Sequence, residues 1–111
     1  MKLILKISTS YALLLLVGAT IGNVAVGQNI EEQGKLIFNQ KAVPACSFCH
    51  SLKHADSMAE SGPDLDSLQP NAEIIENAVR HGKGEMPAIK GLSDDEIKIL
   101  VRYLVSVTGK K

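Results

Sequence analysis

The sequence is poor in aromatic residues and in cysteine, and it has no excess of either charge. Among 111 residues it has no tryptophan, two phenylalanines, two tyrosines and two cysteines. Lysine and arginine together number 12, as do aspartate and glutamate, so no basic surplus is available to neutralise phosphates and nucleic-acid binding is not expected. A short chain with so few aromatic side chains forms a marginal core, and such domains normally need an additional stabilising group.

The first 27 residues have the pattern of an export signal. Lys2 and Lys6 form a basic start, residues 11–21 an apolar segment and residues 25–27 a small-x-small cleavage site. An uncleaved membrane anchor is the alternative, but polar residues interrupt the apolar run and leave it short of the roughly 20 residues that a span needs. The sequence therefore predicts a signal peptide at 1–27, one exported domain at 28–111, and a periplasmic location without stable membrane insertion after cleavage.

Both cysteines stand in the pentapeptide Cys46-Ser47-Phe48-Cys49-His50. Two thiols three positions apart, with a histidine directly after the second, is the spacing of c-type haem attachment. Each thiol can add to one of two neighbouring vinyl groups on the porphyrin edge, and the adjacent imidazole can turn under the ring and bind iron. The motif therefore predicts one covalently bound haem c, held through Cys46 and Cys49, with His50 as a metal ligand.

Two other kinds of site can use the same cysteines. A dithiol redox motif is normally found in a βαβ unit, and nothing nearby alternates like a strand. A structural zinc ion needs four protein ligands, so Cys46, Cys49 and His50 would have to recruit a fourth, for which His54 is a candidate. The first alternative predicts a reactive dithiol, and the second predicts a bound zinc ion, in place of covalent haem.

Helical periodicity occurs in three stretches, which predicts an all-α fold in which the porphyrin is the centre of the core. The first stretch runs from a cap at Asn29 to about residue 39 and places Gly34 and Phe38 on one face. A glycine in the middle of a helix suggests close approach by another helix. The second stretch runs from residue 71 to about residue 81 and ends at Gly82.

The third stretch is the candidate partner of the first. It opens with a capping box from Ser93 to Glu96 and stops at Gly109, with Tyr103 expected at the margin of its apolar stripe. The stripe, at helical spacing, is Ile97, Leu100, Val101, Leu104 and Val105.

Two loops rich in glycine and proline lie on either side of the middle helix. One contains Gly62-Pro63-Asp64-Leu65 and the other contains Met86 before Pro87, so each can cover one face of a flat cofactor. Met86 follows a whole helix and can reach the iron face opposite His50, whereas Met58 lies too soon after the motif to reach that face easily. His54 and His81 are the other candidates for this distal position.

Together these residues resemble a small class I cytochrome c. The resemblance covers nearly all of the chain after residue 27 and is carried by Gly34, Phe38, Cys46-x-x-Cys49-His50, Gly62-Pro63-Asp64-Leu65, Met86-Pro87 and Tyr103. It implies the cytochrome c fold, with three main helices and their loops around one haem. It also implies that the first and last helices cross at a contact between the glycine and the aromatic residues.

The resemblance further implies the roles of individual residues. His50 and Met86 would be the proximal and distal iron ligands, and Pro63 and Leu65 would belong to the cofactor site, with the carbonyl of Pro63 meeting the proximal imidazole. The chain has no tryptophan to bind a haem propionate, and Arg80 is the candidate for that role.

An iron with two protein ligands is suited to moving single electrons, and methionine as the second ligand raises its potential. We therefore expect an exported electron carrier, not an enzyme, between a donor complex or dehydrogenase and a terminal acceptor. The alternatives are a haem c subunit of an exported dehydrogenase, such as a sulfite-oxidising enzyme, and a ligand-binding or peroxidatic haem protein. The expected partners are redox proteins, steered by lysines near the haem edge: Lys41, Lys53, Lys83 and Lys90.

Overall fold

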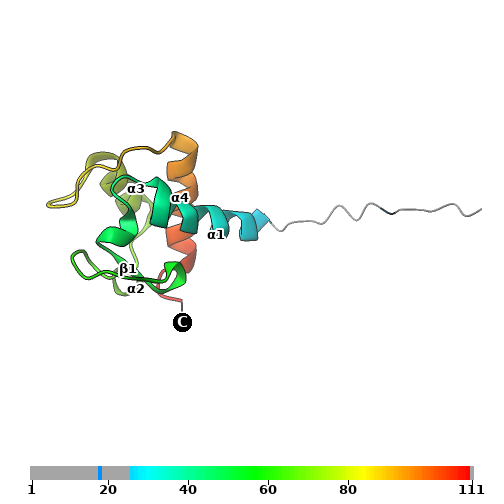
Figure 1. The fold of residues 1–111 in the computed structure, drawn as a ribbon, viewed down its shortest axis with the longest axis horizontal. Helices are drawn as coiled ribbons and strands as arrows, with labels where there is room; N and C mark the ends of the chain where they lie inside the picture. The colour runs from blue at the N-terminus through cyan, green and yellow to red at the C-terminus, as the bar shows by residue number, and fades with distance from the viewer. Residues whose placement is uncertain (1–17, 19–25, 111) are drawn as a thin grey trace, which may run out of the picture.

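The computed structural model describes residue 18 and residues 26–110, so most of the predicted signal peptide lies outside the described residues. Three longer helices dominate the fold (Figure 1): α1 (Val26–Leu36), α3 (Ala72–His81) and α4 (Asp94–Val107). A turn of π-helix, η1 (Ile37–Lys41), continues α1. The smaller elements are the 3-10 turns η2 (Cys46–Phe48) and η3 (Lys53–Ala55), the strands β1 (Ser51–Leu52) and β2 (Ser57–Met58), and the one-turn helix α2 (Leu65–Leu68).

The predicted ends of α3 and the predicted start of α4 are confirmed by their caps, and α4 ends at Val107, two residues before Gly109. Asn71 accepts a hydrogen bond from the backbone N–H of Ile74 at 2.9 Å, and α3 ends at Gly82, whose φ of 75° is in the left-handed region. In α4 the N–H of Glu96 donates to the Ser93 hydroxyl and the N–H of Ser93 donates to the Glu96 carboxylate, at 3.2 and 2.9 Å. Both helices thus satisfy part of their unpaired first-turn donors.

The first helix differs from its prediction at both ends. It begins at Val26, three residues before Asn29, and the side chain of Asn29 accepts a hydrogen bond from Gln33 one turn later at 2.6 Å instead of capping the backbone. At the other end η1 carries the helical path to Lys41, where the N–H of Ala42 closes the last turn on the carbonyl of Ile37. The prediction that Asn29 caps the helix is therefore wrong.

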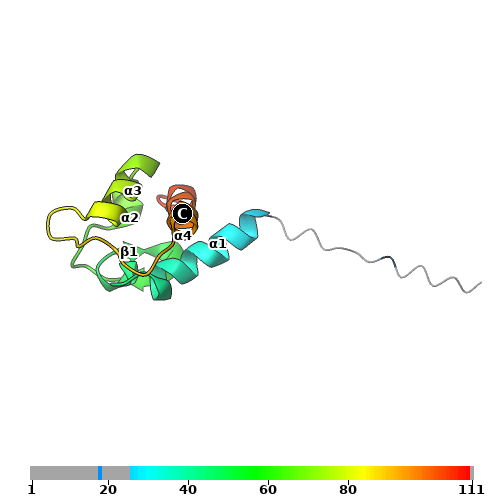
Figure 2. The ribbon, with the colours of Figure 1, turned by 90° about the horizontal axis from the view of Figure 1, so that it is seen from above.

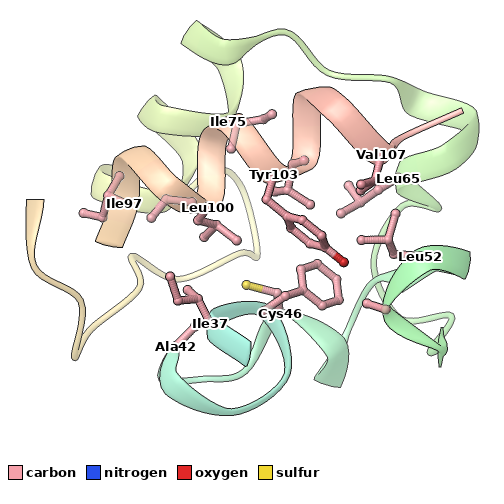
Figure 3. Packing of buried hydrophobic residues seen from close by; sticks show 14 residues of the cluster. Ile37, Ala42, Cys46, Leu52, Leu65, Ile75, Ile97, Leu100, Tyr103 and Val107 are labelled. Atoms are coloured by element: carbon pink, nitrogen blue, oxygen red, sulfur yellow. The ribbon is translucent and has the colours of Figure 1, made fainter. Parts of the chain in front are cut away.

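The crossing of α1 and α4 forms the centre of the core (Figure 2). A β-carbon added at Gly34 would overlap the β- and γ-carbons of Tyr103, so glycine allows the two helices to approach this closely. Tyr103 and Phe38 are fully buried at this crossing, as the resemblance implied. Figure 3 shows the ring of Tyr103 projecting from α4 into the packed side chains.

The buried face of α4 at this crossing differs from the predicted apolar stripe. Tyr103 was expected at its margin and is 0% exposed, whereas Val105 was expected within it and is 50% exposed. Because the close approach at Gly34 directs Tyr103 inward, the buried face turns toward Val107 and away from Val105. The buried face consists of Ile97, Leu100, Tyr103, Leu104 and Val107.

The segment after the cysteines has structure that the sequence did not predict. β1 and β2 pair antiparallel, Ser51 opposite Met58 and Leu52 opposite Ser57, and two-residue strands are too short to show alternation. Asp64 caps α2 by accepting from the N–H of Asp66 at 3.1 Å. Across the part of the chain that is described, no helix is long and apolar enough to span a membrane.

The α1–α4 crossing predicts that Gly34→Ala lowers the free energy of unfolding by about 1–3 kcal/mol, because the added methyl forces the ring of Tyr103 or a helix to move. Chemical denaturation of the haem-loaded protein measures this change. Glu32→Ala is the matched control, since Glu32 is exposed on the same helix and its replacement is expected to change stability by less than about 0.5 kcal/mol. Equal stability of the two variants would contradict the argument.

Candidate cofactor site

A cavity of about 360 Å³ opens between the helices, and a second cavity of about 400 Å³ adjoins it. Both are of the size of small-molecule and cofactor sites. They share five lining residues: Cys46, His50, Pro63, Lys83 and Met86. Leu65 lines the first and Cys49 the second, so all six predicted site residues meet around one connected space.

The imidazole of His50 is held by the loop that begins at Gly62. Nδ1 of His50 lies 2.8 Å from the carbonyl oxygen of Pro63, and the N–H of Gly62 donates to the carbonyl of Cys49 at 2.6 Å. A carbonyl can only accept, so Nδ1 carries the proton and Nε2 keeps its lone pair for a metal. A β-carbon at Gly62 would lie 3.0 Å from this imidazole, so glycine there lets the loop close tightly on the ring.

The two thiols are presented by the 3-10 turn η2. Its turn is closed by the N–H groups of Cys49 and His50, which donate to the carbonyl of Cys46 at 3.2 and 3.0 Å. Cys46 is buried, and burial raises the pKa of its thiol to about 12. A dithiol oxidoreductase needs a thiolate near neutral pH, so Cys46 is in the wrong environment for that alternative.

The zinc alternative also lacks its fourth ligand. Nδ1 of His54 lies 2.9 Å from the hydroxyl of Tyr103, and His54 does not line either cavity. Between residues 26 and 110, no three or more His, Cys, Asp and Glu side chains come close enough to hold a metal ion.

Met86 is placed by a short turn after α3. The N–H of Lys83 donates to the carbonyl of Met86 and the N–H of Met86 donates to the carbonyl of Lys83, both at 2.9 Å. The N–H of Ile89 then donates a hydrogen bond to the carbonyl of Val79 at 2.8 Å, which joins the loop to α3. Backbone hydrogen bonds therefore hold Met86 at the wall of both cavities.

The other candidates for the distal position lie elsewhere. Met58 is 88% exposed on β2, and His81 is exposed at the end of α3. Neither residue lines the two cavities, nor does His54.

The remaining wall of the first cavity is apolar. Ile75, Val79, Leu100 and Leu104 come from the predicted inward faces of α3 and α4, whereas Leu68 and Pro70 were not expected there. Leu68 belongs to α2, a helix too short to be recognised from periodicity. A flat, mostly hydrocarbon ring fits a wall of this composition.

The predicted role of Arg80 in binding a propionate is not met. Its guanidinium donates to Asp94 at 2.8 Å and to Glu76 at 3.1 Å, and Arg80 is absent from the lining of both cavities. These two carboxylates raise the pKa of Arg80, and the arginine in turn lowers the pKa of Asp94. Arg80 therefore joins α3 to the start of α4.

Comparison with known proteins agrees with this site. The model of the family described as cytochrome c oxidase, cbb3-type, subunit III matches residues 29–104. The chain belongs to this family of monohaem c-type cytochromes. Their cofactor is covalent haem c, and the residues of the site fit it: two thiols at the cavity edge, an imidazole with a free Nε2, and apolar walls.

Individual relatives of this cytochrome are electron carriers. Cytochrome c-551 of Halorhodospira halochloris is 35% identical over 75 residues, which cover 66% of this chain and 95% of the relative. Cytochrome c6 of Cyanidioschyzon merolae is 32% identical over 69 residues, which cover 59% of this chain and 66% of the relative. The present cytochrome is likewise an electron carrier and not an enzyme.

The crystal structure of the c-type cytochrome SorU from Sinorhizobium meliloti has the same fold. It matches with a TM-score of 0.71 and 40% identity over 75% of this chain and 95% of that one. The predicted all-α cytochrome c fold is confirmed.

Either Cys46→Ser or Cys49→Ser is expected to reduce the yield of haem-loaded cytochrome sharply, because one thioether is lost and the small core depends on the porphyrin. Absorbance of haem per milligram of purified protein measures the yield. Ser47→Ala is the control, since it leaves both thiols in the same turn. Accumulation of a haem-free double variant with native helicity would contradict the dependence of the core on haem.

Proposed function

We propose that this cytochrome is exported and carries single electrons through a haem iron with His50 and Met86 as its axial ligands. The observation that carries the proposal is that these two side chains, from separate loops, line the same cavity. Bound haem supplies a one-electron couple between ferric and ferrous iron. If His50 and Met86 both bind the iron, a substrate would have no ready access to the metal.

Each residue of the site has a defined part in this proposal. Cys46 and Cys49 fix the porphyrin edge, and the carbonyl of Pro63 orients His50 and increases its basicity as a ligand. The paired backbone hydrogen bonds between Lys83 and Met86 fix the backbone of Met86, from which its thioether would bind the iron in both oxidation states. Little rearrangement then accompanies each electron transfer.

The ligand-binding alternative requires an open distal position and usually a distal acid–base residue. Among the described residues that line the two cavities, His50 is the only histidine, and Glu85 is the only carboxylate. Met86 is available to occupy the distal position. These features favour electron transfer over ligand activation.

Partner docking is proposed at the mouth of the second cavity. Lys83 lines it, and Lys90 is exposed on the segment that pairs with Val43. Lys41 is bound by Glu96, so it contributes less free positive charge than the sequence suggested. The remaining lysines suit a redox partner with an acidic surface.

The ligand assignment predicts that Met86→Ala keeps covalent haem but lowers the reduction potential. The loss of the thioether lets water or a nitrogen ligand bind, and these favour ferric iron. Redox titration and carbon monoxide binding to the ferrous protein measure the change. Met58→Ala is the matched control, since Met58 is exposed on β2 and lines neither cavity. If Met86→Ala changes neither quantity, another residue is the ligand.

The docking surface predicts that replacing Lys83 and Lys90 together by glutamate slows electron transfer to an acidic partner protein and weakens its dependence on salt. Stopped-flow kinetics at several ionic strengths measures both. Lys98→Glu is the control, because it makes the same type of charge change on α4 away from both cavities. Unchanged rates and salt dependence in the double variant would show that partners dock elsewhere.

A further inference from the structure

Haem brings two carboxylates into this site, and the walls of the site offer them few partners. The wall of the first cavity is mostly apolar, and Arg80 is bound to Asp94 and Glu76. A carboxylate that loses water without gaining a donor or an opposite charge is strongly disfavoured. A propionate that lies against this wall therefore needs a partner other than Arg80.

Lys83 is the positively charged side chain that the cavity walls supply. Among the described residues that line the two cavities, Lys83 and His50 are the only basic ones, and Nδ1 of His50 is bonded to the carbonyl of Pro63 while its Nε2 is kept for the iron. Glu85 is the only carboxylate there and would repel a propionate, and Ser61 offers a single hydroxyl. Lys83 lines both cavities.

The ammonium group of Lys83 is also available for a new ion pair. Three other cations of the fold already pair with carboxylates: Lys35 with Asp56, Lys41 with Glu96, and Arg80 with Asp94. In the part of the chain from residue 26 to residue 110, no carboxylate forms an ion pair with Lys83, which is exposed. A carboxylate brought by the cofactor thus meets no competitor for this lysine within the described fold.

The backbone of Lys83 is fixed beside the cavities. Its N–H and its carbonyl are both hydrogen-bonded to Met86 at 2.9 Å, so the two residues face each other across a tight turn. A β-carbon at Gly82 would lie 2.6 Å from the carbonyl oxygen of Met86, so glycine lets this turn approach the end of α3. The four methylenes of a lysine can follow an apolar wall while the ammonium reaches a polar group. Lys83 therefore combines a fixed starting point with a long reach.

We propose that Lys83 binds a haem propionate and takes the role for which Arg80 was expected. The proposal rests on haem c at this site but not on which residue is the distal ligand. The ammonium of lysine has three donors, and its hydrogen bond to a carboxylate is stronger than one between neutral groups. The contact offsets a negative charge close to the iron. Because nearby negative charge favours ferric iron, Lys83 raises the reduction potential.

The first test is a crystal structure of the haem-loaded wild-type cytochrome, which does not depend on the folding of a variant. Nζ of Lys83 is expected within about 3.2 Å of a propionate oxygen. If Nζ lies beyond hydrogen-bond distance of both propionates, the proposal is wrong.

The second test compares Lys83→Leu, Lys83→Arg and wild type by redox titration and by the propionate bending mode in resonance Raman spectra. Lys83→Leu is expected to shift the equilibrium toward ferric iron about three- to tenfold, where tenfold is about 59 mV for one electron. It is also expected to change the Raman mode. Lys83→Arg is expected to restore both quantities, because a guanidinium keeps the charge and binds carboxylates well.

Lys90→Leu is the matched control for the second test. It removes the same charge from an exposed residue of the same connection between α3 and α4, and Lys90 lines neither cavity. The control is expected to leave the Raman mode unchanged. An unchanged mode in Lys83→Leu, or an equal change in Lys90→Leu, would overturn the proposal.

These measurements separate the proposal from the functions proposed above. No partner protein is present, so docking through Lys83 does not affect them. Loss of the methionine ligand would appear as carbon monoxide binding to the ferrous protein, which Lys83→Leu is expected not to show. If Lys83→Leu does bind carbon monoxide, the distance in the wild-type crystal structure decides the proposal.

Discussion

Side chains of α2, α3 and α4 line one cavity, so a porphyrin bound there would make contacts that would otherwise join helix to helix. α3 gives Ile75 and Val79, and α4 gives Leu100 and Leu104. The chain has too few large side chains to close such a space itself, since only three of its aromatic residues follow residue 27. The cofactor is therefore part of the core as well as the redox centre, and the stability of the fold is tied to haem attachment.

Direct helix contact is concentrated instead at the crossing of α1 and α4. Gly34 removes the obstacle to close approach, and Tyr103 fills the space between the helices. The hydroxyl of this tyrosine reaches His54 in the turn that also supports the carbonyl of His50. The packed crossing and the proximal side of the haem are consequently parts of one hydrogen-bonded unit, although they are far apart in sequence.

The sequence predicted those features that depend on local chemistry. The haem motif, the caps at Asn71 and Ser93 and the turn at Gly82 each require particular residues at fixed spacing, and they could be recognised without the fold. The ion pairs of Arg80, the inward turn of Tyr103 and the bond to His54 depend on how distant segments pack. α2 and the two strands were missed because elements of two to four residues have no measurable period.

The environment of Cys46 bears on the order of events during maturation. Burial raises the pKa of the Cys46 thiol, so the reactive thiolate is disfavoured at neutral pH once the chain has folded around it. Thioether formation and disulfide exchange both proceed through thiolate, so a folded, haem-free chain would be a poor substrate for either. Burial of Cys46 by the fold therefore favours an order in which the porphyrin is joined before the chain closes around this thiol.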